Sequence, residues 1–142
     1  MKYDDASWHY GGNLPHGLPP DNAATHIGMF LGWAILRDMV GEAHRNDEER
    51  AFDLDRVRNR QLRPLDFFLN WCDERLTDED LSEEGNAFAA DYYKESYLAD
   101  WAELFLDPYG VDDSWENFGL VVALLDRRFI AWQESLFAVQ VG

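Results

Sequence analysis

Carboxylates and imidazoles stand close together near the start of the chain. Asp4, Asp5 and His9 lie in the stretch KYDDASWHYGG, and His16 and His26 follow it. Carboxylate and imidazole groups are ligands of zinc, iron and manganese, and they also serve as general acids and bases. These five residues are therefore the candidate metal or acid–base site of the sequence.

The same residues also have a structural interpretation. The helical spacings typical of metal sites, His-Glu-x-x-His or paired Glu-x-x-His, do not occur. Asp4 or Asp5 would then cap backbone N–H groups, and His9 would donate a structural hydrogen bond. His26 is expected in the first turn of a helix, where the helix dipole favours a neutral ring. We favour this interpretation, so no metal or other cofactor is expected.

Nucleophilic and phosphate-binding chemistry has little support. The one cysteine, Cys72, falls in the apolar stretch FFLNWC, where an inert, buried thiol is expected. No serine lies in a Gly-x-Ser-x-Gly turn, and Gly11–Gly12 lacks the lysine of a phosphate-binding loop. The sequence therefore predicts that the protein is not an enzyme.

The segments that must position these residues are expected to be an arm and a central helix. Residues 1–24 are rich in helix breakers, namely Gly11, Gly12, Pro15, Gly17, Pro19 and Pro20. They predict an extended arm packed on the core. From Ile27, apolar residues recur at i, i+3, i+4, i+7 and i+8, which predicts a helix with Thr25 as its N-cap.

Further helices are expected along the rest of the chain. They fall within 46–62, 63–76, 76–110 and 113–137, with a break near Ser96. Pro64 suits a first helical position, Thr77 and Asp80 match a capping box, and Ser82 is another candidate cap. No run of alternating β-branched residues indicates a strand. The sequence predicts a single all-α domain, 1–142, of four to six helices preceded by the arm.

Gly28 and Gly32 form a bare strip on the central helix. Each glycine costs a helix on the order of 1 kcal/mol relative to alanine, so another backbone or an aromatic ring should lie close against the strip. We expect Trp8 and Tyr10 of the arm to fill this place and to close the arm on the core as a clasp.

The net charge of the chain is strongly negative. Twenty-eight Asp and Glu against twelve Lys and Arg give −16. Nucleic acids and anionic membranes attract positive charge, so neither is an expected partner. The potential instead favours encounter with a basic protein. The N-terminus lacks a signal-like apolar core, and a single cysteine suits a reducing compartment, so a cytoplasmic location is expected.

The acidic side chains are concentrated between Asp73 and Glu116, where tyrosines alternate with them. This mixture of charge and aromatic groups is typical of contact surfaces, although a solvated, well-capped helix start would have a similar composition. The expected partner-binding residues are Asp78, Glu79, Asp80, Glu83, Glu84, Asp91, Tyr92, Tyr93, Glu95, Tyr97, Asp112 and Asp113. Half of the basic residues lie between Arg45 and Arg63, and we expect these arginines to pair with the acidic helices.

Four stretches of the sequence, KYDDASWHYGG, LPPDNAATHIGMFLGWAIL, LTDEDLSEEGNAFAADYY and LLDRRFIAW, resemble an uncharacterised family of small acidic bacterial proteins. The resemblance extends over nearly the whole chain and brings no catalytic residues with it. Short bacterial proteins of this kind are similar to immunity or antitoxin proteins encoded beside secreted toxins. The resemblance therefore implies an inhibitor that docks on a basic toxin surface or cleft.

Three functions follow as hypotheses. The first is an acidic, immunity-type binding protein with a basic protein partner. The second is a small metal-dependent enzyme or sensor that uses the N-terminal aspartates and histidines. The third is a structural adaptor or homodimer that buries aromatic surface; the sequence leaves the oligomeric state open.

Overall fold

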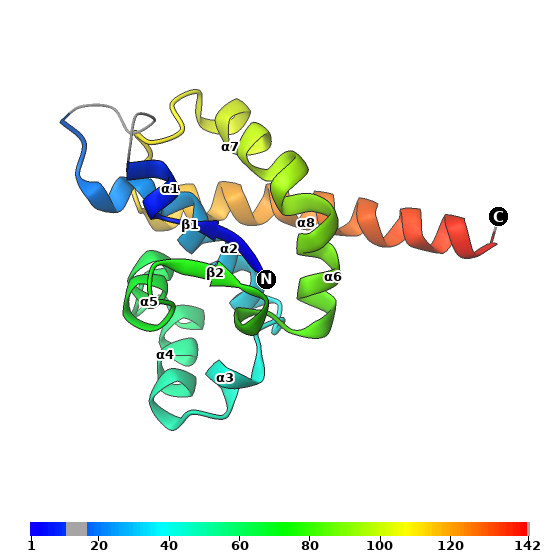
Figure 1. The fold of residues 1–142 in the computed structure, drawn as a ribbon, viewed down its shortest axis with the longest axis horizontal. Helices are drawn as coiled ribbons and strands as arrows, with labels where there is room; N and C mark the ends of the chain where they lie inside the picture. The colour runs from blue at the N-terminus through cyan, green and yellow to red at the C-terminus, as the bar shows by residue number, and fades with distance from the viewer. Residues whose placement is uncertain (11–16, 142) are drawn as a thin grey trace.

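Helix α2 (Thr25–Leu36) runs through the centre of the molecule, as Figure 1 shows. The computed structural model describes residues 1–10 and 17–141. Every residue from Thr25 to Ile35 is buried, because this helix is apolar around its whole circumference and is covered on all sides. The helices α4 (Glu48–Arg58), α5 (Pro64–Trp71) and α8 (Trp115–Val141) pack against it.

The N-terminal segment contains regular structure where an extended arm was expected. Strand β1 (Lys2–Asp5) pairs antiparallel with β2 (Arg75–Thr77), with an irregularity between Lys2 and Asp4. A short helix, α1 (Ser7–Tyr10), and a 3-10 turn, η1 (Pro20–Ala23), follow. The fold is therefore mostly α with a small two-stranded sheet, and the all-α prediction is corrected to that extent.

Backbone hydrogen bonds join the segment that follows α2 to the segment that precedes α6. Helix α3 (Glu42–Arg45) begins just after Gly41, whose N–H donates to the backbone carbonyl of Asp80 in the 3-10 turn η2 (Asp78–Asp80). An isolated bridge pairs Val40 with Leu81 beside this contact. These backbone hydrogen bonds fix the end of α2 against the start of α6.

Helix α6 (Glu83–Tyr92), the π-helical segment η3 (Tyr93–Tyr97) and α7 (Leu98–Phe105) form one continuous helical stretch, in which α7 turns away from the direction of α6, as Figure 1 shows. The predicted break near Ser96 is confirmed only as a change to π-helical geometry, since the helix continues through it. Its wider turn directs the aromatic rings of Tyr93 and Tyr97 into the core, where both contact Phe30 of α2. This helical stretch therefore supplies buried aromatic side chains as well as surface charge.

The predicted helix ends are confirmed at three places and wrong at one. Pro64 occupies the first turn of α5, Thr77 and Asp80 form a capping box, and the Ser82 hydroxyl accepts from the Gly85 N–H. Thr25, by contrast, is the first helical residue of α2 and makes no cap, because the 3-10 turn η1 runs directly into the helix.

The bare strip on α2 faces α5 and not the arm. A Cβ at Gly28 would lie 2.8 Å from Leu65 Cα, and one at Gly32 would lie 2.6 Å from Pro64 Cβ. Trp8 is 52% exposed, with the Lys2 ammonium over its ring. The predicted clasp against the glycines is therefore wrong, since the close approach comes from the α5 backbone at Gly28 and from the rings of Pro64 and Phe118 at Gly32.

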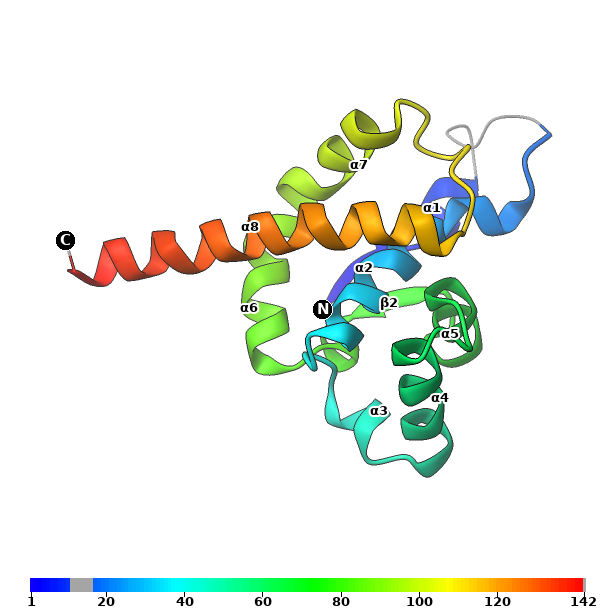
Figure 2. The same ribbon diagram turned by 180° about the vertical axis from the view of Figure 1, so that it is seen from behind.

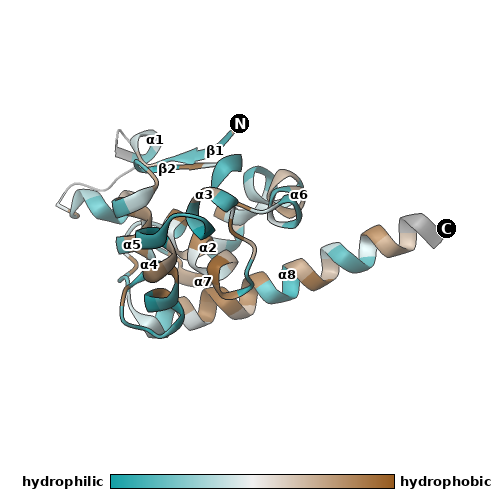
Figure 3. Ribbon diagram, turned by 90° about the horizontal axis from the view of Figure 1, so that it is seen from below, coloured by the Kyte–Doolittle hydropathy of each residue, from teal (hydrophilic) through white to brown (hydrophobic). Residues whose placement is uncertain are grey.

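Helix α8 extends well beyond the body of the molecule, as Figure 2 shows from behind. Its first half contributes core residues such as Leu125 and Phe129. Beyond Trp132 the helix leaves the body, and hydrophobic turns remain visible on it in Figure 3. Leu136 and Phe137 of that part are exposed. None of the helices in the described residues has the length and apolar character needed to cross a membrane.

Candidate functional site

Three of the N-terminal candidate residues meet at one point inside the molecule. Asp4 comes from β1, His9 from α1 and His26 from the first turn of α2, and all three are buried. His9 Nε2 lies 2.8 Å from Asp4 Oδ1, and His26 Nε2 lies 3.0 Å from Asp4 Oδ2. We call these three residues the His–Asp–His cluster.

The Asp4 carboxylate accepts four hydrogen bonds from the residues that the structure describes. Besides the two imidazoles, the Asp5 N–H donates to Oδ1 over 2.8 Å and the Tyr93 hydroxyl donates to Oδ2 over 2.7 Å. Burial opposes ionisation of Asp4, but hydrogen bonds from His26, His9 and Tyr93 outweigh it and lower the pKa of Asp4. Asp4 is therefore a buried carboxylate that stays ionised near neutral pH.

The hydrogen-bond network assigns a tautomer to each ring of the cluster. A carboxylate only accepts, so both Nε2 atoms carry a proton, and in a neutral ring Nδ1 then keeps a lone pair. His9 Nδ1 lies 2.8 Å from the Tyr109 hydroxyl, from which it would accept as a neutral ring. His26 Nδ1 has no partner among the described residues. Burial lowers the pKa of His26 against the opposing effect of Asp4, so this ring is neutral, as the sequence predicted.

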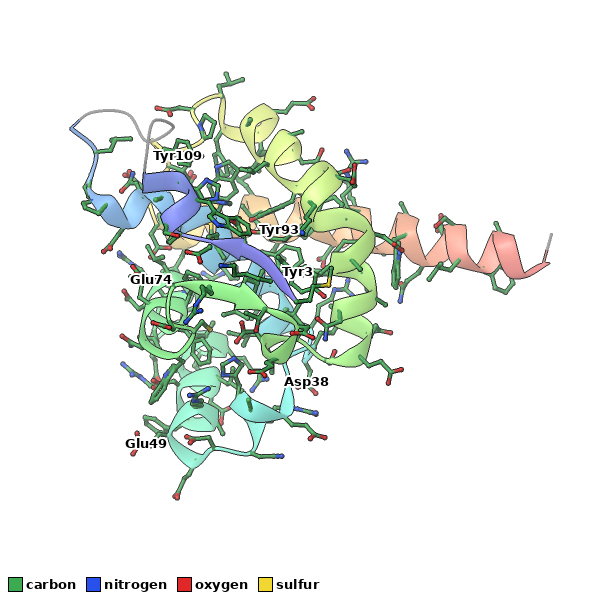
Figure 4. The ribbon with its side chains drawn as sticks, in the orientation of Figure 1. Tyr3, Asp38, Glu49, Glu74, Tyr93 and Tyr109 are labelled. Atoms are coloured by element: carbon green, nitrogen blue, oxygen red, sulfur yellow. The ribbon has the colours of Figure 1, made fainter. Side chains whose placement is uncertain are left out.

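Two tyrosines from distant segments complete the surroundings of the cluster. Figure 4 shows Tyr93 and Tyr109 beside the N-terminal strand and helix. A cavity of about 200 Å³ borders the cluster and is lined by Tyr3, Asp4, Trp8, His9, Tyr93, Lys94 and Leu98. Nothing in the sequence around Tyr93 or Tyr109 pointed to this place, because 89 and 105 positions separate them from Asp4.

The other two N-terminal candidates are not part of the cluster. The Asp5 carboxylate accepts from the N–H and hydroxyl of Ser7 and from the Lys2 ammonium, so it caps the chain as the structural interpretation predicted. His16 lies outside the described residues. The site that sequence reasoning proposed is thus reduced to Asp4, His9 and His26.

A second group of potential ligands, His44, Cys72 and Asp80, lies close together, and sequence reasoning missed it. His44 Nε2 is 2.8 Å from Asp80 Oδ1 and 3.9 Å from Cys72 Sγ. Arg50 Nη1 approaches His44 Nδ1 at 3.5 Å. Burial, followed by the charge of Asp80, raises the pKa of Cys72 far above its usual range, so the thiol is protonated. The prediction of a buried thiol is confirmed.

The predicted partner-binding residues divide into an exposed group and a buried group. The exposed carboxylates are Asp78, Glu79, Glu83, Glu84, Asp91, Glu95 and Asp112, and Asp113 is half-buried. Tyr92, Tyr93, Tyr97 and Asp80 are buried, so their expected exposure is wrong. The π-helical segment turns Tyr93 and Tyr97 inward, and Tyr92 stacks on Phe88 of α6. Asp80 is held by His44 and by its capping box.

A groove lies between the end of α2, α3, α6 and α8. Its volume is about 890 Å³, and it is lined by Arg37, Asp38, Met39, Gly41, Glu42, Arg45, Leu81, Ser82, Glu83, Glu84, Ala87 and Trp132. Four of these residues are carboxylates and two are arginines. Arg37 is already paired with Asp126 of α8, so the groove presents an excess of negative charge. We call it the acidic groove.

The arginines of the middle segment find partners near themselves. Arg56 pairs with Asp53, and Arg58 pairs with Asp55, all within α4. Arg58 also reaches Asp38 at 3.5 Å. These ion pairs are local to α4 and the end of α2, and not the pairing with the acidic helices that was expected.

A comparison with models of protein families assigns the chain to a family. The model of a domain of unknown function, DUF7832, matches residues 2–111. The chain belongs to the DUF7832 family. The DUF7832 match includes both ligand groups and the carboxylates of α6, whereas all of α8 follows it. No curated protein and no solved structure matches the chain.

Two places among the described residues have the character of a site. The His–Asp–His cluster holds metal-ligating groups next to a small cavity. The acidic groove offers exposed carboxylates in a concave surface. They lie toward opposite ends of α2, since His26 is in its first turn and Arg37 follows its last residue, about 16 Å apart along the helix axis.

Proposed function

We propose that this protein is an acidic binding protein of the immunity or antitoxin type, which neutralises a cognate toxin by covering a basic surface or active-site cleft. The observation that carries the proposal is the acidic groove, in which Glu42, Glu83 and Glu84 stand around a concave surface. A basic loop or helix of a partner would bring opposite charge to these carboxylates.

The charge of the whole chain supports the same proposal. A net charge of −16 produces a long-range negative potential that speeds encounter with a positively charged protein. Such steering weakens as salt screens the charges, with a Debye length of about 8 Å at physiological ionic strength. The partner is therefore expected to be basic, and the association rate is expected to fall with added salt.

Trp132 gives the acidic groove an apolar element. Its ring lines the groove, and its Nε1–H donates to Asp91 of α6 over 2.8 Å. Tryptophan is among the residues enriched at energetically important positions of protein interfaces. We infer that Trp132 supplies the apolar contact, while Glu83 and Glu84 orient the partner.

The test compares two variants of equal charge. In the groove variant, Glu42, Glu83 and Glu84 are changed to Gln; in the control variant, the exposed Glu49, Glu103 and Glu116 are changed to Gln. Each variant loses three negative charges. Binding to the proteins encoded beside this chain is measured by surface plasmon resonance at low and moderate salt, and protection is measured by co-expression in growing cells.

The groove variant should lose at least about tenfold in association rate and should no longer protect cells, because local complementarity is lost. The control variant should retain most of both, since only the distant field changes. Equal losses in the two variants would assign the effect to net charge alone. Absence of binding by the unaltered protein, even at low salt, would refute the proposal.

A further inference from the structure

The His–Asp–His cluster brings three metal-ligating groups together from separate elements. The ligand atoms of Asp4, His9 and His26 all lie within 4.8 Å of one another. The ligands of a tetrahedral zinc ion, at about 2.0–2.2 Å from the metal, lie about 3.3 Å apart. The contacts of the imidazoles with Asp4, 2.8 Å to Oδ1 and 3.0 Å to Oδ2, are a few tenths of an ångström shorter than this, and the two rings would turn toward an ion shared with one carboxylate oxygen.

We propose that Asp4, His9 and His26 form a zinc-binding site with one open coordination position. Two imidazoles and one carboxylate are a known ligand set for zinc, and a three-ligand set leaves room for water or a small ligand. The open position would face the cavity of about 200 Å³, which Asp4 and His9 both line. This inference does not depend on the acidic groove or its partner.

The groups around the cluster suit a bound metal ion. Ligating carboxylates are usually hydrogen-bonded, and the Asp5 N–H and Tyr93 hydroxyl would still donate to Asp4 when the imidazoles turn to the metal. Zinc requires the lone pair of Nε2, so the proton moves to Nδ1 in each neutral ring. In His9 that Nδ1–H would donate to the Tyr109 oxygen, 2.8 Å away.

The second ligand group lacks these features. The Arg50 guanidinium faces Nδ1 of His44, and a guanidinium only donates, so Nδ1 must keep its lone pair. The proton then stays on Nε2 and is donated to Asp80. The positive charge of Arg50 also opposes a cation at this place. His44, Cys72 and Asp80 therefore serve as the negative control for zinc binding.

The experiment uses the full chain, with any affinity tag removed and with metal stripped by a chelator. Isothermal titration with zinc chloride, followed by metal analysis of the dialysed protein, is expected to give one zinc ion per chain. The variants are His9→Gln, His26→Gln and, as the matched control, His44→Gln. Gln retains an N–H that can donate to the aspartate but ligates zinc poorly, so the fold is preserved.

Loss of His9 or His26 should weaken zinc binding by more than about 100-fold, because losing a ligand exceeds the 10- to 100-fold effect of losing an outer hydrogen bond. Tyr109→Phe, which removes such an outer bond, should weaken it by about 10- to 100-fold. His44→Gln should leave binding unchanged. Near-ultraviolet circular dichroism checks that each variant is folded.

Two results would overturn the zinc site. One is less than stoichiometric zinc in the unaltered protein. The other is stoichiometric zinc that persists in both His9→Gln and His26→Gln. If either of these variants fails to fold, cobalt(II) added to the unaltered protein decides the matter: visible absorption bands typical of four-coordinate cobalt support the site, and their absence refutes it.

Discussion

The Tyr93 hydroxyl donates to Asp4 Oδ2 over 2.7 Å and thereby joins residues 89 positions apart. Burial, together with the charge of Asp4, raises the pKa of Tyr93 well above its usual value, so the hydroxyl keeps its proton. This bond attaches the N-terminal strand to the helical stretch formed by α6, η3 and α7.

Removing the Tyr93 hydroxyl should destabilise the fold. Tyr93→Phe deletes a hydrogen bond to a buried charge, so the free energy of unfolding should fall by about 2 kcal/mol, as measured by urea denaturation. The matched change Tyr3→Phe removes a partly buried bond to Asn86 Oδ1, and should cost only about 1 kcal/mol. A smaller loss for Tyr93→Phe than for Tyr3→Phe would contradict the importance given to Asp4.

The glycines of α2 should not tolerate alanine. At Gly32 a Cβ would lie 2.6 Å from Pro64 Cβ, so Gly32→Ala should lower the free energy of unfolding by about 1–3 kcal/mol despite its better helix propensity. Gly119→Ala on α8 is the control, since a Cβ there meets nothing within 4 Å. It should stabilise the protein by about 0.5–1 kcal/mol. Thermal unfolding of both variants measures the contrast.

Asp113 should make the stability depend on pH. Burial, reinforced by Asp66 and opposed by Arg63, raises the pKa of Asp113 to about 6. A carboxyl with a raised pKa in the folded state binds its proton more tightly there. Its ionisation therefore costs stability as the pH rises from about 4, the unfolded value, to about 6, and the cost persists at pH 7.

The variant Asp113→Asn should consequently be more stable than the unaltered protein at pH 7, by about 1 kcal/mol after allowing for solvent screening of this half-buried group. The difference should vanish near pH 3.5, where the carboxyl is protonated in both states. Asp112→Asn, an exposed neighbour, provides the same charge change without burial. Urea denaturation at the two pH values measures the free energy of unfolding of each protein. A lower stability of Asp113→Asn than of the unaltered protein at pH 7 would disprove the effect.

The two halves of α8 should respond differently to truncation of a phenylalanine. Phe129 is 2% exposed and contacts Trp33 and Phe88, so Phe129→Ala should cost about 3–5 kcal/mol. Phe137, eight positions later, is 68% exposed, and its change to Ala should alter stability by no more than about 0.5 kcal/mol. A large loss at Phe137 would mean that a partner or second copy covers this end of the helix.

Several features were predictable because they depend on nearby residues. The helix caps at Thr77 and Ser82, the first-turn proline Pro64 and the break near Ser96 follow from short-range geometry. The apolar circumference of α2 follows from composition within one segment. The strand β1 was not predictable, because Lys2–Asp5 has no strand pattern of its own and acquires its structure from pairing with β2.

The candidate site, too, was predictable only in the features that depend on residue type and composition. Asp4, His9 and His26 could be selected from residue type alone, and the net charge alone indicated a basic partner. Their convergence at one point, together with Tyr93 and Tyr109, required the strand, two helices and a distant loop to be brought together. The second ligand group of His44, Cys72 and Asp80 was missed for this reason, since its members have no regular spacing in the chain.

The sequence by itself determined which of the longer segments are helical, where several of them begin, and the sign of the net charge. Only the tertiary structure decided which side chains face inward, since Tyr92, Tyr93 and Tyr97 all read as surface residues and all are buried. The physical reason is that helix formation and capping depend on residues within one or two turns. Burial and the meeting of ligands depend on contacts between segments that the linear pattern does not encode.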